Sequence, residues 1–288
     1  MVNVGRVGIW SFGLRNDDPN AAGEIREAAA ELERLGYDAI WLGANPGVDH
    51  AVPVLEATSR VVVATSILNI WEYDAAEVAA RHTAVSAAHP GRFLLGLGAS
   101  HAGLVEGYRR PYSAMVAYLD GLDAEGVPRS ERVLAALGPR MLALSRDRAA
   151  GAHPYLVTPE HTAQAREILG PDRVLAPEIK VVLDTDPERA RATARQHLGM
   201  YMTLPNYTNN LLRLGFTEDD FAEGGSDRLI DAAVAWGDVE AVRRQIAAHR
   251  DAGADHAVLQ VLSADPSGLP RTEWRELAAG LGLDRRGS

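Results

Sequence analysis

The chain has 288 residues, of which 29 are basic and 39 acidic, and it contains no cysteine. The lack of cysteine excludes a disulfide framework, a thiolate zinc site, an iron–sulfur cluster and a cysteine nucleophile, so redox chemistry would need a cofactor. The formal charge of -10 and the lack of a basic, aromatic-rich stretch argue against nucleic acid and anionic membranes as partners. Because no apolar run approaches the roughly 20 residues that span a bilayer, and the N-terminus has no secretory pattern, we expect a cytoplasmic protein.

Short apolar runs alternate with amphipathic segments along the whole chain. The first run is followed by a segment in which Ile25, Ala28, Leu32 and Leu35 recur at helical spacing, and Gly36 stands where a helix commonly ends. The predicted strands are 7–12, 39–42, 61–68, 93–97, 132–137, 152–157, 179–183 and 257–262. The predicted helices are 21–35, 51–59, 75–88, 112–124, 139–149, 159–169, 238–252 and 272–281, with a further one beginning at 187.

Alternation of eight strands with helices is typical of a single (β/α)8 TIM barrel, which we expect to span residues 1–288 as one domain. A doubly wound open sheet is the second possibility. Residues 199–235 interrupt the alternation after strand seven, and we interpret them as an insertion that covers the mouth of the barrel. In a barrel the functional site lies at the carboxyl ends of the strands, so the loops that follow them hold the candidate residues.

Two of these loops carry groups suited to ligand binding. After strand four, Gly98, Ala99, Ser100 and His101 combine a backbone free to approach a ligand with polar side chains, although a simple tight turn explains the glycines equally well. After strand five, the segment 138–140 reads Gly-Pro-Arg, which is typical of a helix start whose free amides can face a phosphate. An ordinary helix start is the alternative interpretation.

Tryptophan, histidine and lysine supply the other candidates. Trp71 follows strand three and is large enough to wall a pocket, whereas core packing is the alternative for tryptophans on strands. The histidines have no metal-ligand spacing, so no metal site is expected; His50, His101 and His153 stand near strand ends. Lys180 is expected at the start of strand seven, on the face away from the site, which argues against a Schiff-base aldolase. The predicted mouth also offers few of the paired carboxylates that a glycosidase requires.

Five segments together resemble the luciferase-like flavin and deazaflavin oxidoreductases. They are LGYDAIW at 35–41, ATSIL at 64–68, HPGRFLLGLG at 89–98, LGPRML at 137–142 and DAGADH at 251–256. They occur in the order and spacing of that family over almost the whole chain. Within the family, the chain is most similar to the branch that uses coenzyme F420, judged by the residues of strand three and the Gly-Pro-Arg of the fifth helix.

The resemblance implies a (β/α)8 barrel with an insertion after strand seven, a homodimer formed through flanking helices, and hydride transfer at a deazaflavin ring. It also implies a bulge at the end of strand three with a cis peptide that does not precede proline, here between Ser66 and Ile67, against the back of the ring. Gly98, Ala99 and Ser100 are then expected beside the cofactor. Its phosphate is expected at Gly138, Pro139 and Arg140.

The chain departs from the family pattern at two positions. Members that oxidise sugar phosphates or secondary alcohols carry an Asp-His pair just after strand two, where this chain has Gly43 and Ala44; its Asp49 and His50 come later. Those members also carry a glutamate at the position of His101. These differences argue against both oxidations and make His101 the candidate catalytic group, because an imidazole exchanges protons near neutral pH.

The leading hypothesis is an F420-dependent oxidoreductase that exchanges hydride with a small organic substrate held under the insertion. Trp71, Tyr201, Asn206 and Tyr207 are the candidate substrate contacts, with packing of the lid as the alternative for the last three. A second hypothesis is an FMN-dependent monooxygenase served by a separate reductase. A third is a cofactor-binding protein without turnover, which the missing Asp-His pair motivates.

Overall fold

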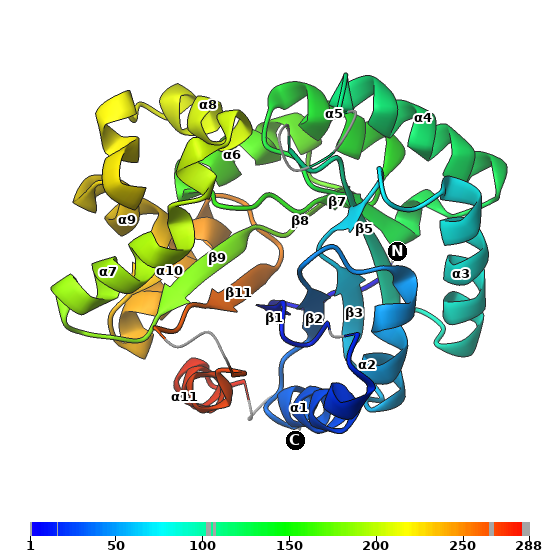
Figure 1. The fold of residues 1–288 in the computed structure, drawn as a ribbon, viewed down its shortest axis with the longest axis horizontal. Helices are drawn as coiled ribbons and strands as arrows, with labels where there is room; N and C mark the ends of the chain where they lie inside the picture. Colours follow the sequence, from blue (N-terminus) through cyan, green and yellow to red (C-terminus); the bar gives the residue numbers. More distant parts are fainter. Residues whose placement is uncertain (1, 16, 102–104, 106–107, 265–267, 284–288) are drawn as a thin grey trace.

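The computed structural model describes residues 2–15, 17–101, 105, 108–264 and 268–283, and it contains a curled sheet of parallel strands ringed by helices (Figure 1). The strands are β1 (Val7–Ser11), β2 (Ala39–Leu42), β3 (Val62–Thr65), β4 (Leu68–Asn69), β5 (Phe93–Gly98), β6 (Arg132–Leu134), β7 (Gly151–Ala152), β8 (Val174–Leu175), β9 (Glu178–Val182), β10 (Val234–Trp236) and β11 (Ala257–Val261). The helices are α1 (Ala22–Arg34), α2 (Val52–Glu56), α3 (Ala75–Ala88), α4 (Pro111–Ala124), α5 (Pro139–Arg148), α6 (Pro159–Leu169), α7 (Pro187–Leu198), α8 (Pro205–Arg213), α9 (Asp227–Ala233), α10 (Val239–Asp251) and α11 (Arg271–Leu281).

The sheet closes on itself through the short stretch that joins β8 to β9. Strand order runs β10-β9-β11-β1-β2-β3-β5-β6-β7-β8, so β8 and β9 stand near opposite ends of the hydrogen-bonded order although two residues separate them in the chain. The amide of Ala176 donates to the carbonyl of Ala152 over 3.0 Å on one side, and the amide of Val258 donates to the carbonyl of Pro177 over 3.1 Å on the other. The expected barrel is therefore confirmed, and a doubly wound open sheet is excluded.

The observed strands differ from the predicted ones where proline or a bulge interrupts the ladder. The predicted seventh strand, 179–183, is in fact two pieces that begin at Val174, because Pro177 lacks an amide hydrogen and separates β8 from β9. The predicted sixth strand, 152–157, keeps its ladder only at Gly151–Ala152, before Pro154. Strand three is divided into β3 and β4 by the residues 66–67.

The interruption after strand seven forms a helical insertion on one end of the barrel. It contains α8 and α9 together with the 3-10 turns Tyr201–Thr203 and Glu218–Gly224 (Figure 1). Its apolar side chains share a core with Leu156, Val182 and Leu262, which lie at or after the carboxyl ends of β7, β9 and β11. The insertion therefore covers the end of the barrel where a functional site is expected.

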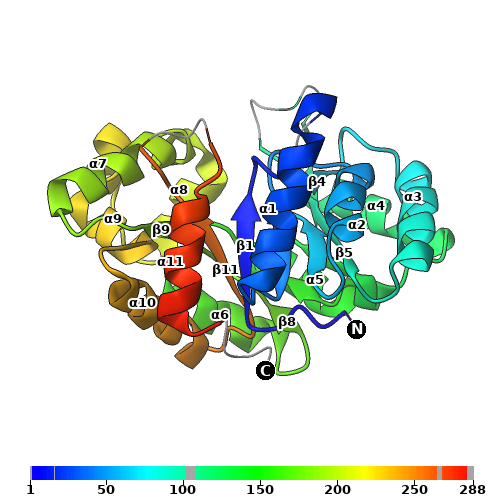
Figure 2. The ribbon, with the colours of Figure 1, turned by 90° about the horizontal axis from the view of Figure 1, so that it is seen from below.

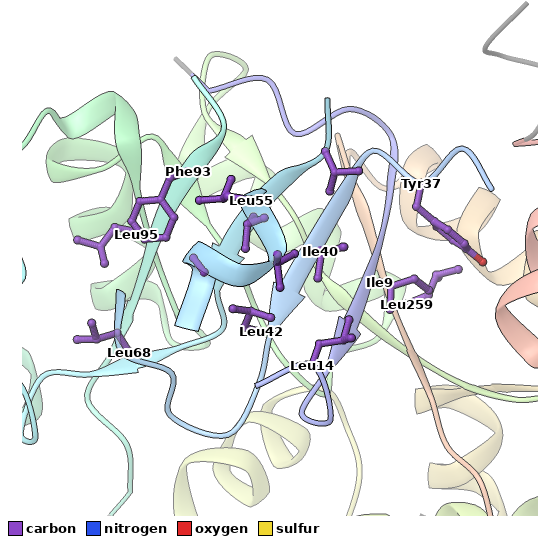
Figure 3. Packing of buried hydrophobic residues seen from close by; sticks show 14 of the residues in the cluster. Ile9, Leu14, Tyr37, Ile40, Leu42, Leu55, Leu68, Phe93, Leu95 and Leu259 are labelled. Carbon is purple, nitrogen blue, oxygen red and sulfur yellow. The ribbon is translucent and has the colours of Figure 1, made fainter. Parts of the chain in front are cut away.

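The main core fills the space between the sheet and its surrounding helices. Ile40 and Leu42 of β2 lie near Leu55 of α2 in this core, and Ile9 of β1 lies beside Leu259 of β11 (Figure 3). The first and last helices lie side by side against β1 (Figure 2), where Glu31 accepts hydrogen bonds from two arginines of α11. No helix of the described residues is long and apolar enough to cross a membrane.

Candidate active site

A cavity of about 590 Å³ opens at the carboxyl ends of the strands, between the barrel and the insertion. The described residues that line it include no Asp, Glu, Lys or Arg, so it can accept an uncharged ring system without burying an ion. Ten residues predicted from the sequence line it: Ser66, Ile67, Gly98, Ala99, Ser100, His101, Gly138, Tyr201, Asn206 and Tyr207.

One wall of the cavity is a bulge at the end of strand three. Ala64 pairs with Leu94 whereas Leu68 pairs with Leu97, so four residue steps on one strand match three on the other. The peptide bond between Ser66 and Ile67, within the bulge, is cis, as the resemblance implied. The result is a section of backbone, without ladder pairing to β5, that lines the cavity.

The side chain of Ile67 occupies the space that a side chain on Gly98 of β5 would need. A Cβ atom at Gly98 would lie 2.5 Å from Cδ1 of Ile67, so a larger residue at this position would require the Ile67 side chain to shift. Trp71 does not line the cavity: its Nε1 donates to the carbonyl of Ala99 over 2.6 Å, and its ring packs 5.8 Å from that of Tyr108. Trp71 therefore supports the loop after β5 from behind, and its direct contact with substrate stays a prediction.

A chain of hydrogen bonds supports the bulge from the barrel interior. Nε1 of Trp10 donates to Oγ of Ser66 over 2.8 Å, and that oxygen lies 2.7 Å from Nε2 of His153. Nδ1 of His153 lies 2.7 Å from the carbonyl of Ala176, which can only accept, so Nδ1 carries the proton and Nε2 accepts from Ser66. Burial lowers the pKa of His153 to about 4, which keeps the imidazole neutral.

The space of the missing Asp-His pair after strand two is occupied by Trp10. A Cβ atom at Gly43 would lie 2.3 Å from Cζ2 of the Trp10 ring, so no larger residue fits there. The later pair does not line the cavity: Nε2 of His50 lies 2.8 Å from Oδ1 of Asp17, and Asp49 pairs with Arg81. At the place of a titratable base, this chain therefore has the indole N–H of Trp10, which is a neutral donor.

His101 lies on the loop after β5, where that loop meets the insertion. Ser100, with a φ of 55°, turns the chain so that the His101 ring lies 5.2 Å from that of Tyr207. Desolvation lowers the pKa of His101, and a hydrogen bond with Asn206 opposes the shift. Nδ1 of His101 is buried and has no hydrogen-bond partner among the described residues.

The N-terminus of α5 forms the cationic end of the site. Gly138 precedes this helix and lines the cavity, Pro139 is its first residue, and the exposed Arg140 places its guanidinium 4.4 Å from the ring centre of Tyr112. Arg213 of α8 reaches the same point, since Nη2 of Arg213 would lie 3.9 Å from a Cβ atom on Gly138. The helix terminus and the guanidinium together suit an anion.

Lys180 does not lie on the remote face that the sequence had suggested. It is fully buried, and its Nζ lies 3.8 Å from the ring centre of Tyr155, which lines the cavity. The error follows from the strand boundary: the strand begins at Val174, so Lys180 lies well along it. Nζ is bound to Glu178 over 3.0 Å, which leaves it unsuited to a Schiff base.

Comparison with known proteins agrees with this geometry. A family model described as luciferase-like monooxygenase matches residues 6–120. A protein of Mycobacterium tuberculosis named "Putative coenzyme F420-dependent oxidoreductase" is 23% identical over 329 aligned positions, which cover 88% of this chain and 93% of that protein. Both findings agree with the resemblance seen in the sequence, the first over residues 6–120 and the second over most of the chain.

Solved structures show the same fold over nearly the full length. An F420-dependent secondary alcohol dehydrogenase in complex with an F420-acetone adduct has a TM-score of 0.75 at 15% identity, covering 98% of this chain and 99% of that one. The F420-dependent tetrahydromethanopterin reductase of Methanopyrus kandleri has a TM-score of 0.69 at 14% identity, covering 96% and 97%. The oxygenating component of 3,6-diketocamphane monooxygenase of Pseudomonas putida, in complex with FMN, has a TM-score of 0.66 at 12% identity, covering 95% and 96%. The chain thus has the (β/α)8 barrel fold that these structures share.

Proposed function

We propose that this protein is an oxidoreductase that exchanges a hydride between coenzyme F420 and a small organic substrate. The observation that carries the proposal is the cavity itself, which runs from a backbone wall at Ser66 and Ile67 toward the N-terminus of α5. A flat ring with a phosphorylated tail matches an uncharged cavity with a cationic end. When bound, the deazaflavin accepts or delivers the hydride.

The residues of this chain would hold that cofactor by three kinds of contact. The backbone at Ser66 and Ile67 would support the back of the ring, and Gly98, Ala99 and Ser100 would adjoin it. The amides that begin α5, with Arg140 and Arg213, would bind the phosphate. Tyr201, Asn206 and Tyr207 of the insertion would then enclose the substrate and exclude water.

FMN is the alternative cofactor, because a structural relative holds FMN on the same scaffold. Titration of the protein with each cofactor, followed by fluorescence, decides between them. We expect F420 to bind and FMN to bind at least about tenfold more weakly. Tight binding of FMN without affinity for F420 would replace this proposal with a monooxygenase that depends on a separate reductase.

The same titration tests the cationic end. We expect Arg213→Met to weaken F420 binding by about ten- to a hundredfold, because a charge-assisted hydrogen bond to phosphate contributes about 1.5–3 kcal/mol. Arg243→Met is the matched control, since this arginine pairs with Glu240 on the outer helix α10. Equal affinities of the two variants would place the phosphate elsewhere.

His101 is proposed as the group that exchanges a proton with the substrate. Because burial lowers its pKa, the ring is neutral at pH 7 and is able to accept a proton. We expect His101→Gln to slow the substrate-dependent oxidation of reduced F420 by about a hundredfold in stopped-flow measurements, with cofactor affinity unchanged.

The outcome of that experiment also separates turnover from binding alone. An unchanged rate in the variant would remove His101 from the mechanism. If no carbonyl, imine or activated alkene in a substrate panel oxidises the bound reduced cofactor, the protein is a cofactor-binding protein without turnover.

We further propose a homodimer, for which sedimentation of the full chain is the test.

A further inference from the structure

A buried polar cluster continues inward from the wall of the cavity, and the function proposed above makes no use of its deeper members. Nζ of Lys180 donates to Oε1 of Glu178 and to Oε1 of Gln260, both over 3.0 Å. The hydroxyl of Tyr155 lies 2.7 Å from the same oxygen of Gln260 and 3.0 Å from the hydroxyl of Tyr201. The cluster joins β9 to β11, which are neighbours in the barrel (Figure 1), and ends at Tyr201 on the cavity surface.

The charge of Lys180 fixes the orientation of the Gln260 amide. An ammonium group has donors only, so the atom of Gln260 that faces it must be the carbonyl oxygen. Burial lowers the pKa of Lys180, whereas the carboxylate of Glu178 and the ring of Tyr155 beneath Nζ stabilise the ammonium form. Gln260 therefore presents an acceptor, and not its NH2 group, to the hydroxyl of Tyr155.

The orientation of Gln260 in turn fixes both tyrosines. Tyr155 has a single hydroxyl proton, and it must point to Gln260, because two acceptors 2.7 Å apart would repel each other. Its oxygen is then an acceptor toward Tyr201, so the proton of Tyr201 points inward to Tyr155. The lone pairs of Tyr201 are left facing the cavity.

We propose that Tyr201 is a specificity residue, held as a hydrogen-bond acceptor toward the cavity by Tyr155, Gln260 and Lys180. It would select a substrate that presents a hydroxyl or N–H group at this point over one that presents only a carbonyl oxygen. The inference rests on the proposed function for the identity of the cavity as a substrate site. The three deeper residues are positioning residues, since they act on the substrate through Tyr201.

The cluster orients hydrogen bonds but does not conduct protons. The carbonyl oxygen of Gln260 accepts from both Lys180 and Tyr155, and an amide oxygen that accepts from both sides has no proton to pass on. A relay of protons from Lys180 to the cavity would need a hydroxyl, water or imidazole at this place. The effect of the cluster is therefore on which ligand binds.

The test compares two probes that have equal numbers of heavy atoms, cyclohexanol and cyclohexanone, bound to the full chain without cofactor. The alcohol offers a donor and the ketone does not. We expect calorimetry or ligand-observed NMR to give about tenfold tighter binding of the alcohol. Tyr201→Phe and Gln260→Leu should both abolish this preference, the second because Tyr155 and Tyr201 are then free to reverse their protons.

Gln260→Glu serves as the rescue, because a carboxylate is also an acceptor toward Tyr155 and should keep the preference. A merely structural role for Gln260 would not distinguish the Leu and Glu variants in this way. Equal binding of the two probes, or of neither, by the unaltered chain would overturn the proposal, as would a preference that survives Tyr201→Phe.

Neutron diffraction from deuterated crystals checks the polarity without any ligand and without variants that must fold. We expect the Tyr155 deuteron to point at Oε1 of Gln260 and the Tyr201 deuteron to point at Tyr155. A Tyr201 deuteron directed into the cavity would overturn the proposal. Titration of the unaltered chain with F420 tests the proposed function separately from the orientation of Tyr201. If F420 does not bind, the proposed function is contradicted, but the expected deuteron positions are unaffected.

Discussion

Replacing Gly96 with alanine is expected to lower the free energy of unfolding by about 4 kcal/mol or more. A Cβ atom at this position would lie 1.9 Å from the carbonyl oxygen of Thr65, which is backbone and cannot rotate away. The two strands cannot separate either, because Thr65 Oγ1 donates to the carbonyl of Gly96 and accepts from its amide, each over 2.8 Å. The methyl group therefore forces the bulge apart at its base.

Chemical denaturation followed by circular dichroism measures this change. Gly23→Ala is the control, since nothing lies within 4 Å of its Cβ position and alanine favours the helix, so we expect a gain of about 0.5 kcal/mol. The bulge also forms the wall of the cavity, so any folded Gly96→Ala protein should bind F420 more weakly. Equal stability of the two variants would mean that the bulge adapts, contrary to this argument.

The barrel was predictable because its signal is local and repeated. Strands that are buried on both faces appear in the sequence as continuous apolar runs. Each helix buries one apolar face, which appears as apolar residues at three- and four-residue spacing. The helix predicted at 75–88 has those bounds in the structure. The bulge was also predicted, but from the resemblance and not from any local pattern.

The supporting residues of the site were not predictable, because their partners are distant in sequence. Trp10 donates a hydrogen bond to Ser66, 56 residues away in sequence, and Tyr155 donates one to Gln260, 105 residues away. Arg213 reaches Gly138 only because the insertion folds over the barrel. One local signal was available: Gly43 after a strand indicates that another group needs the space of its side chain, here the Trp10 ring.

Acidification from pH 6.5 to pH 4 is expected to unfold the protein, because three histidines are buried in neutral form. Burial lowers the pKa values of His153, His249 and His256 to about 4 each. The unfolded chain binds a proton at each near pH 6.5, so it holds more protons than the folded chain throughout this interval. The stability that these groups contribute is complete above pH 6.5 and is lost as the pH falls toward 4.

The loss amounts to about 3 kcal/mol for each histidine, or about 10 kcal/mol together, which is comparable with the whole stability of a typical domain. Urea unfolding at half-unit steps of pH measures it, with a constant m-value as the check that unfolding stays two-state. His256→Gln should reduce the slope by one proton, about 1.4 kcal/mol per pH unit, since the amide is able both to accept from Trp41 and to donate to Gly5. A flat profile from pH 6.5 to 5 would show that these imidazoles are charged in the folded protein, and the neutral His153 that supports Ser66 in the cavity wall would then be wrong.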